Sequence, residues 1–192
     1  MIIWLNGAFG AGKTTTAAEL VTLVPDSRVF DPETVGYMLT PNLADQWPGD
    51  FQHWPPWRSL VAATVAELTA YTGQHLIAPQ TVTTERYLEE IITALHAAGI
   101  DVFHVLLDVR EPALRRRIEG SQEAVEWRLQ HVAEYQASRS WLLHAADLVV
   151  DTTELSPADA AAGIVRALPP LSPPRPAAQG WATMRDQSSP VT

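Results

Sequence analysis

Short apolar segments alternate with helical patterns through residues 1–168 of this 192-residue chain. The segments that suit buried strands are residues 1–5, 28–30, 75–78, 102–107 and 148–150. Strands that alternate with helices are typical of a parallel sheet covered by helices on both faces. The pattern therefore predicts an α/β fold with five strands and about six helices.

Two of the expected helices carry clear boundary signals. In one, apolar residues recur at helical spacing and stop at Gly99; they are Leu88, Ile91, Ile92, Leu95 and Ala98. The other has Ser156 as its N-cap and Pro157 in its first turn. After Leu168 the chain becomes rich in proline and small residues. We therefore expect residues 169–192 to form a disordered or loosely attached tail.

Residues 7–14 match the phosphate-binding pattern G-x-x-x-x-G-K-[ST], with the sequence Gly7, Ala8, Phe9, Gly10, Ala11, Gly12, Lys13 and Thr14. Lys13 is the only lysine in the chain. Its compact ammonium fits between the β- and γ-phosphates of a nucleotide, where an arginine fork would not. An apolar strand precedes the loop and a helix-forming segment, residues 14–23, follows it, which favours a nucleotide site over a chance glycine-rich turn. We expect Thr14 to hold Mg²⁺ and Thr15 to join the nucleotide contacts.

Composition narrows the classes of protein that fit. A hydrophobic content of 46% suits one domain with a sizeable core. A net charge of −9 argues against nucleic acid as a partner. The absence of cysteine excludes disulfides, thiolate catalysis and cysteine-bound zinc. With no leader pattern and no membrane-spanning run, we expect a soluble, cytoplasmic protein without integral membrane association.

A phosphate loop alone does not separate kinases from GTPases or ATPases. GTPases usually carry an N-K-x-D sequence, and this chain has no second lysine to supply it. Ring-forming ATPases usually need a longer chain. A small kinase remains, in which a strand end supplies an acid and a mobile segment supplies arginines.

Two aspartates follow apolar strands. Asp31 lies where a strand is expected to end near the phosphates, so its carboxylate could accept a proton from an attacking hydroxyl and help to hold Mg²⁺. The alternative for Asp31 is an Asp-Pro turn or a helix cap. Asp108 resembles the aspartate that assists Mg²⁺ in many nucleotide-binding proteins, although capping the next helix is an equal alternative.

Arginines are frequent between residues 115 and 139: Arg115, Arg116, Arg117, Arg128 and Arg139. Arg117 and Arg128 are the candidates for nucleotide binding, one stacking on the base and the other reaching the phosphates. A solvated face with salt bridges to nearby glutamates is the alternative.

Residues 47–58, which we call the aromatic segment, are rich in tryptophan and proline. Aromatic faces with a few polar groups suit a sugar or nucleobase, so this segment is a candidate acceptor site; a hydrophobic plug over the sheet is the alternative. Between Asp26 and Glu85 the only lysine or arginine residues are Arg28 and Arg58. Gripping a phosphate usually takes several arginines, so a neutral hydroxyl acceptor is favoured over a nucleoside monophosphate.

Residues 1–14, Asp31-Pro32-Glu33, residues 50–52 and residues 56–58 resemble the tunicamycin-resistance family of P-loop proteins, over about residues 1–168. That family is similar in fold to nucleoside monophosphate kinases, shikimate kinase and chloramphenicol phosphotransferase. The resemblance implies a strand order of 2-3-1-4-5, an acceptor-binding part at about residues 32–74 and a lid at about residues 115–139. It also implies substrate contacts from Asp31, Glu33, Asp50, Gln52, Trp54, Trp57, Arg58 and Gln80.

These observations together predict a phosphotransferase that uses ATP and Mg²⁺ to modify a hydroxyl of a small molecule. A nucleoside-type antibiotic such as tunicamycin is the leading acceptor, with resistance as the outcome. Lys13 and Asp31 are the expected catalytic residues, and Thr14 and Asp31 the expected metal ligands. A drug-sequestering protein without chemistry, or a nucleotide kinase, remains an alternative, and a homodimer is compatible with the sequence.

Overall fold

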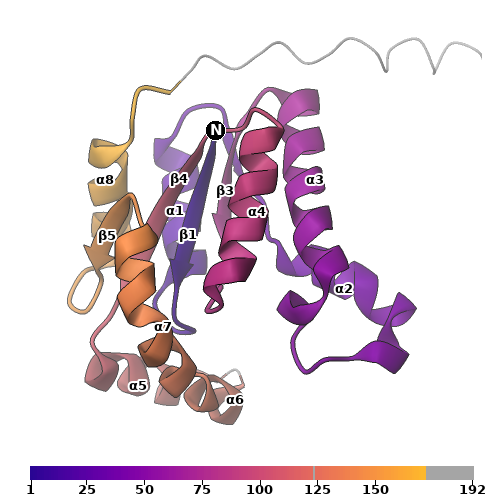
Figure 1. Ribbon diagram of the computed structural model, residues 1–192. Helices are drawn as coiled ribbons and strands as arrows, with labels where there is room; N and C mark the ends of the chain where they lie inside the picture. The colour runs from indigo at the N-terminus through magenta and orange to yellow at the C-terminus, as the bar shows by residue number, and fades with distance from the viewer. Residues whose placement is uncertain (123, 172–192) are drawn as a thin grey trace, which may run out of the picture.

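The computed structural model describes residues 1–122 and 124–171 as a central sheet flanked by helices (Figure 1). The five strands are β1 (Ile2–Gly7), β2 (Ser27–Val29), β3 (His75–Pro79), β4 (Val102–Asp108) and β5 (Leu148–Asp151). All neighbouring strands are parallel, in the order β2-β3-β1-β4-β5. The predicted fold class, strand set and strand order are confirmed.

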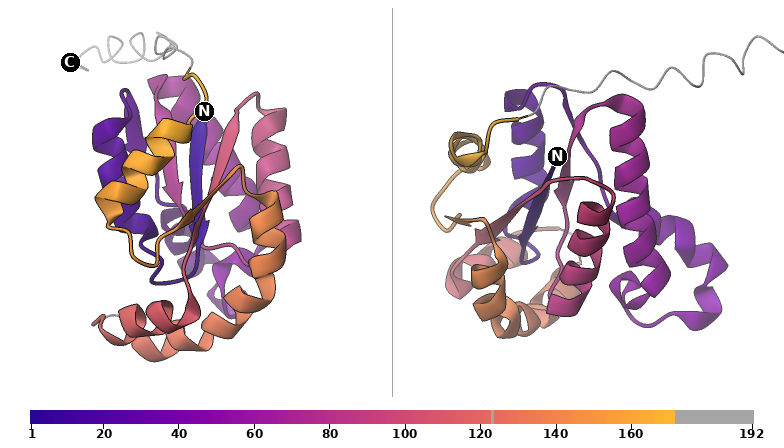
Figure 2. Two further views of the ribbon diagram at one scale, coloured as in Figure 1. Left: turned by 90° about the vertical axis from the view of Figure 1, so that its left-hand side faces the viewer. Right: turned by 45° about the horizontal axis from the view of Figure 1, so that its top comes forward.

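The helices connect successive strands on both sides of the sheet (Figure 2). In the described part of the chain they are α1 (Lys13–Leu23), α2 (Glu33–Leu39), α3 (Pro55–Thr72), α4 (Glu85–Ala97), α5 (Glu111–Glu119), α6 (Val125–Gln130), α7 (Val132–Ala145) and α8 (Pro157–Ala167). Three short 3₁₀ helices, Thr40–Asn42, Ala44–Gln46 and Phe51–His53, lie between α2 and α3. The count of about six helices was too low, because α2 and α6 are too short to show a helical apolar pattern. None of these helices is long and apolar enough to cross a membrane.

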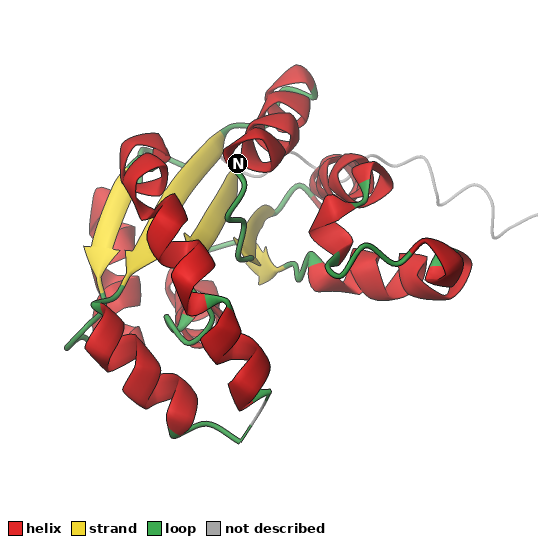
Figure 3. Ribbon diagram, turned by 60° about the horizontal axis from the view of Figure 1, so that its bottom comes forward, coloured by secondary structure: helices red, strands yellow, loops and turns green. Residues whose placement is uncertain are grey.

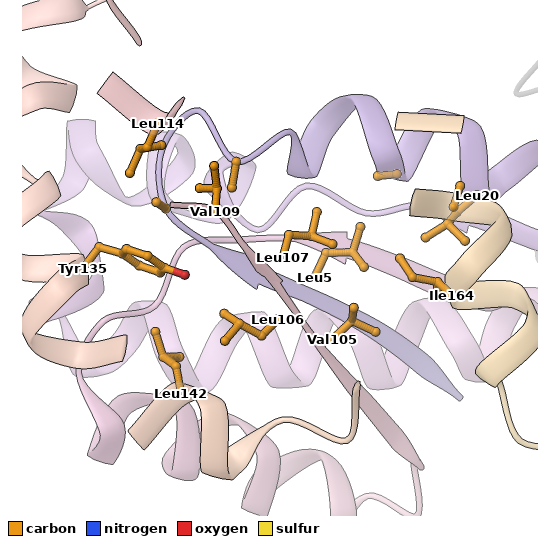
Figure 4. Packing of buried hydrophobic residues seen from close by; sticks show 14 of the residues in the cluster. Leu5, Leu20, Val105, Leu106, Leu107, Val109, Leu114, Tyr135, Leu142 and Ile164 are labelled. Carbon is orange, nitrogen blue, oxygen red and sulfur yellow. The ribbon is translucent and has the colours of Figure 1, made fainter. Parts of the chain in front are cut away.

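Side chains from alternate strand positions build two cores, because successive residues of a strand point to opposite faces. Leu5, Val105 and Leu107 pack with Leu20 of α1 and Ile164 of α8 on one face (Figure 4). The other face buries a second cluster against α3 and α4, whose members include Trp4, Leu76, Trp57, Val61, Leu88 and Ile91. Both faces of the sheet are covered, as its near-continuous apolar strands require.

The carboxyl ends of the strands all point to one end of the molecule. The loop after β1 lies there, between the α2–α3 region on one side and α5, α6 and α7 on the other (Figure 3). In open α/β sheets ligands bind at this edge. The expected tail falls mainly on residues 172–192, which lie outside the described residues.

Candidate functional site

The loop from Gly7 to Gly12 wraps around the N-terminus of α1. Gly12 is the N-cap of that helix. Its φ is 92°, a backbone conformation that residues other than glycine rarely adopt. Gly7 ends β1 so close to β4 that an added Cβ would lie 2.6 Å from the carbonyl oxygen of Leu107. The loop therefore needs glycine at both positions to present its amides and the helix N-terminus to an anion.

Asn6 holds the start of the loop and was missed by the sequence analysis. It is fully buried, and its Oδ1 accepts hydrogen bonds from the backbone N–H groups of Gly7 (2.8 Å) and Val82 (3.0 Å). Its Nδ2 donates to the Val82 carbonyl at 3.1 Å. An asparagine at the end of an apolar strand, immediately before the loop glycine, was the available signal.

Lys13 turns back onto its own loop. Its Nζ donates to the carbonyl oxygens of Gly7 and Ala8, each at 2.9 Å. Burial lowers the pKa of Lys13 from 10.5 to about 7, partly offset by the negative charge of Glu33, while Arg128 lowers it further. The ammonium thus lies where a triphosphate would become its strongest partner.

A cavity of about 460 Å³ lies over the loop, and several of the predicted site residues line it. It is lined by Phe9, Gly10, Gly12, Lys13, Thr14, Thr15, Val29, Asp31, Glu33, Pro79, Thr81 and Arg128. Asp31, which is separated from Lys13 and Thr14 in the sequence, shares this one space with them. A hydroxyl and a carboxylate are oxygen ligands of the kind that Mg²⁺ prefers, so Thr14 and Asp31 fit the predicted metal.

Asp31 forms the turn that was the structural alternative for it, and it also lines the cavity. Its Oδ1 accepts a hydrogen bond from the Glu33 backbone N–H at 2.9 Å, which is the turn expected of an Asp-Pro sequence. The residue is also exposed and lines the cavity over the loop. The turn fixes the carboxylate at the sheet edge, so the structural role supports the chemical one.

Arg117 and Arg128 line two different cavities beside the loop. Arg128 lines the cavity that contains Lys13, whereas Arg117 lines a second cavity of about 240 Å³ beside Gly10 to Gly12. Arg117 donates to the carbonyl oxygens of Thr152 (2.5 Å) and Thr153 (3.3 Å) in the β5–α8 connection. The arrangement is suited to one arginine near the base and the other near the phosphates.

Trp54 and Trp57 lie in the core and face no cavity. Trp57 is fully buried, and its Nε1 donates to the Pro32 carbonyl at 3.1 Å. Trp54 is 6% exposed, and its Nε1 donates to the Gln46 carbonyl at 3.0 Å. Both rings fill the core, as the alternative of a hydrophobic plug describes, and their contact with an acceptor stays a prediction.

Asp50, Gln52 and Arg58 form a network that holds the aromatic segment together. Asp50 accepts hydrogen bonds from the backbone N–H (2.9 Å) and Nε2 (3.2 Å) of Gln52. Arg58, only 5% exposed, donates to the Gln52 carbonyl and to Glu90, each at 2.5 Å, and stacks on Tyr87. None of the three lines the cavity over the loop, so the expected substrate contact of Arg58 is replaced by an ion pair.

Gln80 lies just beyond β3, near the loop but outside its cavity. It is 2% exposed, and its Nε2 donates to the Thr81 carbonyl at 3.1 Å. Its Oε1 has no hydrogen-bond partner among the described residues. The neighbouring Thr81, which no motif indicated, does reach the cavity and donates to the Gly7 carbonyl at 2.9 Å.

Asp108 does not cap α5, and its carboxylate is engaged by side chains of α7. It lies outside the cavity over the loop, and the N-cap of α5 is Arg110. Its carboxylate accepts two hydrogen bonds from Arg139, at 2.9 and 2.6 Å, and one from the Tyr135 hydroxyl at 3.0 Å. Burial raises the pKa of Asp108, but these hydrogen bonds outweigh burial and hold the pKa below its usual value. Asp108 therefore ties α7 to β4.

Comparisons with solved structures identify proteins of similar fold. The chain is similar to the tunicamycin resistance protein of Deinococcus radiodurans, with 28% identity and a TM-score of 0.65 over 90% of this chain and 98% of that one. This match confirms the predicted resemblance. A search of curated proteins finds no match.

Two further matches share the fold. Shikimate kinase from Acinetobacter baumannii is 19% identical, with a TM-score of 0.59 over 86% of this chain and 90% of that one. The APS kinase of Mycobacterium tuberculosis is 16% identical, with a TM-score of 0.55 over 86% of this chain and 95% of that one. The family model described as an AAA domain, AAA_33, matches residues 2–142. Since this match spans well over half of the sequence, the protein belongs to the AAA_33 family.

Proposed function

We propose that this protein is a small-molecule kinase that uses ATP and Mg²⁺ to phosphorylate a hydroxyl group. The observation that carries the proposal is the single cavity shared by Lys13, Thr14 and Asp31. These residues supply a counter-charge for phosphate, a metal ligand and an acid at the sheet edge. The kinase folds among the structural neighbours support the same class of reaction.

ATP would supply the phosphoryl group, and Mg²⁺ would neutralise part of its charge. The loop amides and the α1 N-terminus would hold the phosphates, with Thr14 and Asp31 as metal ligands. Lys13 would exchange the Gly7 and Ala8 carbonyls for phosphate oxygens. Arg128 would add positive charge beside them, and Arg117 would lie near the base.

Asp31 would orient the acceptor hydroxyl and take its proton. The carboxylate lines the same cavity as the loop and Lys13, and an acceptor would approach the terminal phosphate there. Its turn with Glu33 holds the group in place before substrate arrives. A positioned carboxylate of this kind usually contributes about 10²- to 10⁴-fold to the rate.

The charge of the cavity favours an uncharged acceptor. Asp31 and Glu33 line its acceptor side, while Arg58 is engaged by Glu90. A nucleoside monophosphate would meet two carboxylates there and would find Arg58 already paired. The similarity to a tunicamycin resistance protein makes tunicamycin and other nucleoside-type antibiotics the first acceptors to test.

We also propose that two segments of residues 1–168 have separate functions. Residues 32–74 would form the acceptor-binding part and residues 115–139 the lid, because these segments lie on either side of the loop at one end of the sheet (Figure 3). The protein would act in the cytoplasm, where ATP is available.

Mass spectrometry of reaction mixtures tests the proposal. The protein is incubated with ATP, Mg²⁺ and a panel of uncharged nucleoside antibiotics, including tunicamycin, with nucleoside monophosphates as a second panel. A phosphoryl group added to an uncharged compound supports the proposal, and the Lys13→Ala variant should abolish the addition. Phosphorylation of monophosphates alone would indicate a nucleotide kinase, and ATP-dependent binding without modification would indicate sequestration.

A further inference from the structure

The phosphate loop contacts the predicted lid through three aromatic rings. Phe9 projects from the loop, and its ring lies edge-on to Trp127 of α6 with centroids 4.6 Å apart. His131, which follows α6, lies 5.6 Å from Phe9 and 4.0 Å from Trp127. The His131 Nδ1 lies 2.7 Å from the Trp127 carbonyl oxygen, which fixes the ring beside the helix. Phe9 thus joins the loop to a helix more than a hundred residues further along the chain.

Both partners of this contact are linked to charges in the nucleotide cavity. The Nζ of Lys13 lies 5.4 Å from the centroid of the Phe9 ring. Arg128 directly follows Trp127 and lines the same cavity as Lys13 and Phe9. Two adjacent residues of α6 therefore face the nucleotide site: Trp127 contacts Phe9, and Arg128 lines the cavity.

Among the described residues, α6 makes few apolar contacts with the core. None of the residues of α6 is fully buried, and only Val125 and Leu129 pack against the main core. Trp127 is 39% exposed, so its ring is not part of that core. Trp127 is partly exposed, and its ring contacts Phe9, whose residue type the phosphate-loop pattern leaves open. This contact suggests that Trp127 has a role in the site more than a role in stability.

From this contact we propose that Phe9 and Trp127 are positioning residues. Their edge-to-face contact fixes α6 against the phosphate loop and places Arg128 in the nucleotide cavity. The inference rests on nucleotide binding as proposed above, but it does not depend on the identity of the acceptor or on transfer to it.

The test is a double-mutant cycle on ATP affinity, measured by calorimetry with ATP and Mg²⁺. Trp127→Ala should weaken ATP binding roughly three- to tenfold, as expected for the loss of an aromatic pair. Arg128→Ala should weaken it by about tenfold or more, since a charged contact is lost. In the Arg128→Ala background, adding Trp127→Ala should have no further effect. Phe9→Ala should behave as Trp127→Ala does, and Trp127→Phe should restore most of the affinity.

Leu23→Ala serves as the matched control, because it also shortens an exposed apolar side chain, on α1 at a distance from the cavity. It should leave ATP affinity unchanged. Wild-type affinity in Trp127→Ala or in Arg128→Ala would overturn the inference. So would an equal loss from Trp127→Ala whether or not Arg128 is present, since that would indicate a general structural role. If wild-type protein binds ATP and the cycle behaves as expected but no acceptor is modified, only the proposed kinase activity fails.

Discussion

At the residue scale, Lys13 makes ATP binding sensitive to pH. Its pKa in the nucleotide-free protein is lowered to about 7 by burial. The triphosphate oxygens of bound ATP would raise the pKa of Lys13 again, because they stabilise its ammonium form. At a pH above 7, Lys13 therefore has to take up a proton when ATP binds. ATP affinity should therefore fall as the pH rises from 7 to 9.

Calorimetry in two buffers with different ionisation enthalpies measures this uptake. We expect close to one proton per ATP at pH 8.5 and almost none at pH 5.5, where Lys13 is already charged. In Lys13→Ala, proton uptake on ATP binding should no longer differ between pH 8.5 and pH 5.5. Equal proton uptake at both pH values in the wild type would contradict the assignment.

His104 gives a second pH dependence, this time of stability. It is 2% exposed in β4, and its Nδ1 lies 3.0 Å from the Ala145 carbonyl oxygen. Burial lowers its pKa below 6.5, although the contacts with Ala145 and Asp147 oppose the shift. The folded state then binds fewer protons than the unfolded state, so stability should fall as the pH falls below about 6.5.

Thermal melts at pH 7.5 and pH 5.0 test this expectation. His104→Gln should lose less stability between the two pH values than the wild type does. His144→Gln, which replaces an exposed histidine, should retain the wild-type difference. An unchanged difference in His104→Gln would show that another group is responsible.

At the element scale, the attachment of α7 to the sheet depends on Asp108. Arg139→Ala would leave this buried carboxylate with the Tyr135 hydroxyl as its remaining side-chain donor. The Arg139 side chain is 41% exposed, so its removal should cost less than breaking a fully buried ion pair. We expect the free energy of unfolding to fall by about 1–3 kcal/mol. Urea denaturation at pH 7 measures the loss.

Arg115→Ala is the control for that experiment. Arg115 pairs with Glu111 on the surface of α5, and such pairs contribute about 0.3–0.5 kcal/mol. A loss from Arg139→Ala no larger than that of Arg115→Ala would contradict the role given to Asp108.

The elements that could be predicted from the sequence are those with a local cause. β1, β3, β4 and β5 are largely apolar because a parallel sheet is buried on both faces, whereas β2 is a short, mostly exposed edge strand. The phosphate loop needs a fixed order of glycines, lysine and threonine. The acceptor contacts expected of the aromatic segment could not be judged from the sequence, because they depend on contacts between distant segments. Nothing local indicated that Arg58 pairs with Glu90, or that Trp57 donates to the Pro32 carbonyl. Aromatic residues in a loop look alike in sequence whether they line a site or fill a core.

At the scale of the whole molecule, the two cores define where the folded unit ends. Leu168 and Leu171 pack against the main cluster after α8 ends at Ala167. Removing residues 172–192 should therefore change the melting temperature little, as the polar composition of that tail also suggests. Removing residues 168–192 should lower it measurably, because two apolar contacts are lost. A large drop on removing residues 172–192 alone, seen by calorimetry, would contradict this boundary.

The central claim is that Asp31 acts on the acceptor while Lys13 and the loop hold the nucleotide. Steady-state kinetics with one confirmed acceptor, together with ATP titration, tests it most directly. Asp31→Asn keeps an amide oxygen that can still face Mg²⁺, so it should retain near wild-type ATP affinity, but without a carboxylate to take the proton it should lower kcat by about 10²- to 10⁴-fold. Asp108→Asn, the matched variant, should lower stability and leave kcat within a few fold. Wild-type turnover in Asp31→Asn together with an inactive but folded Asp108→Asn would contradict the account.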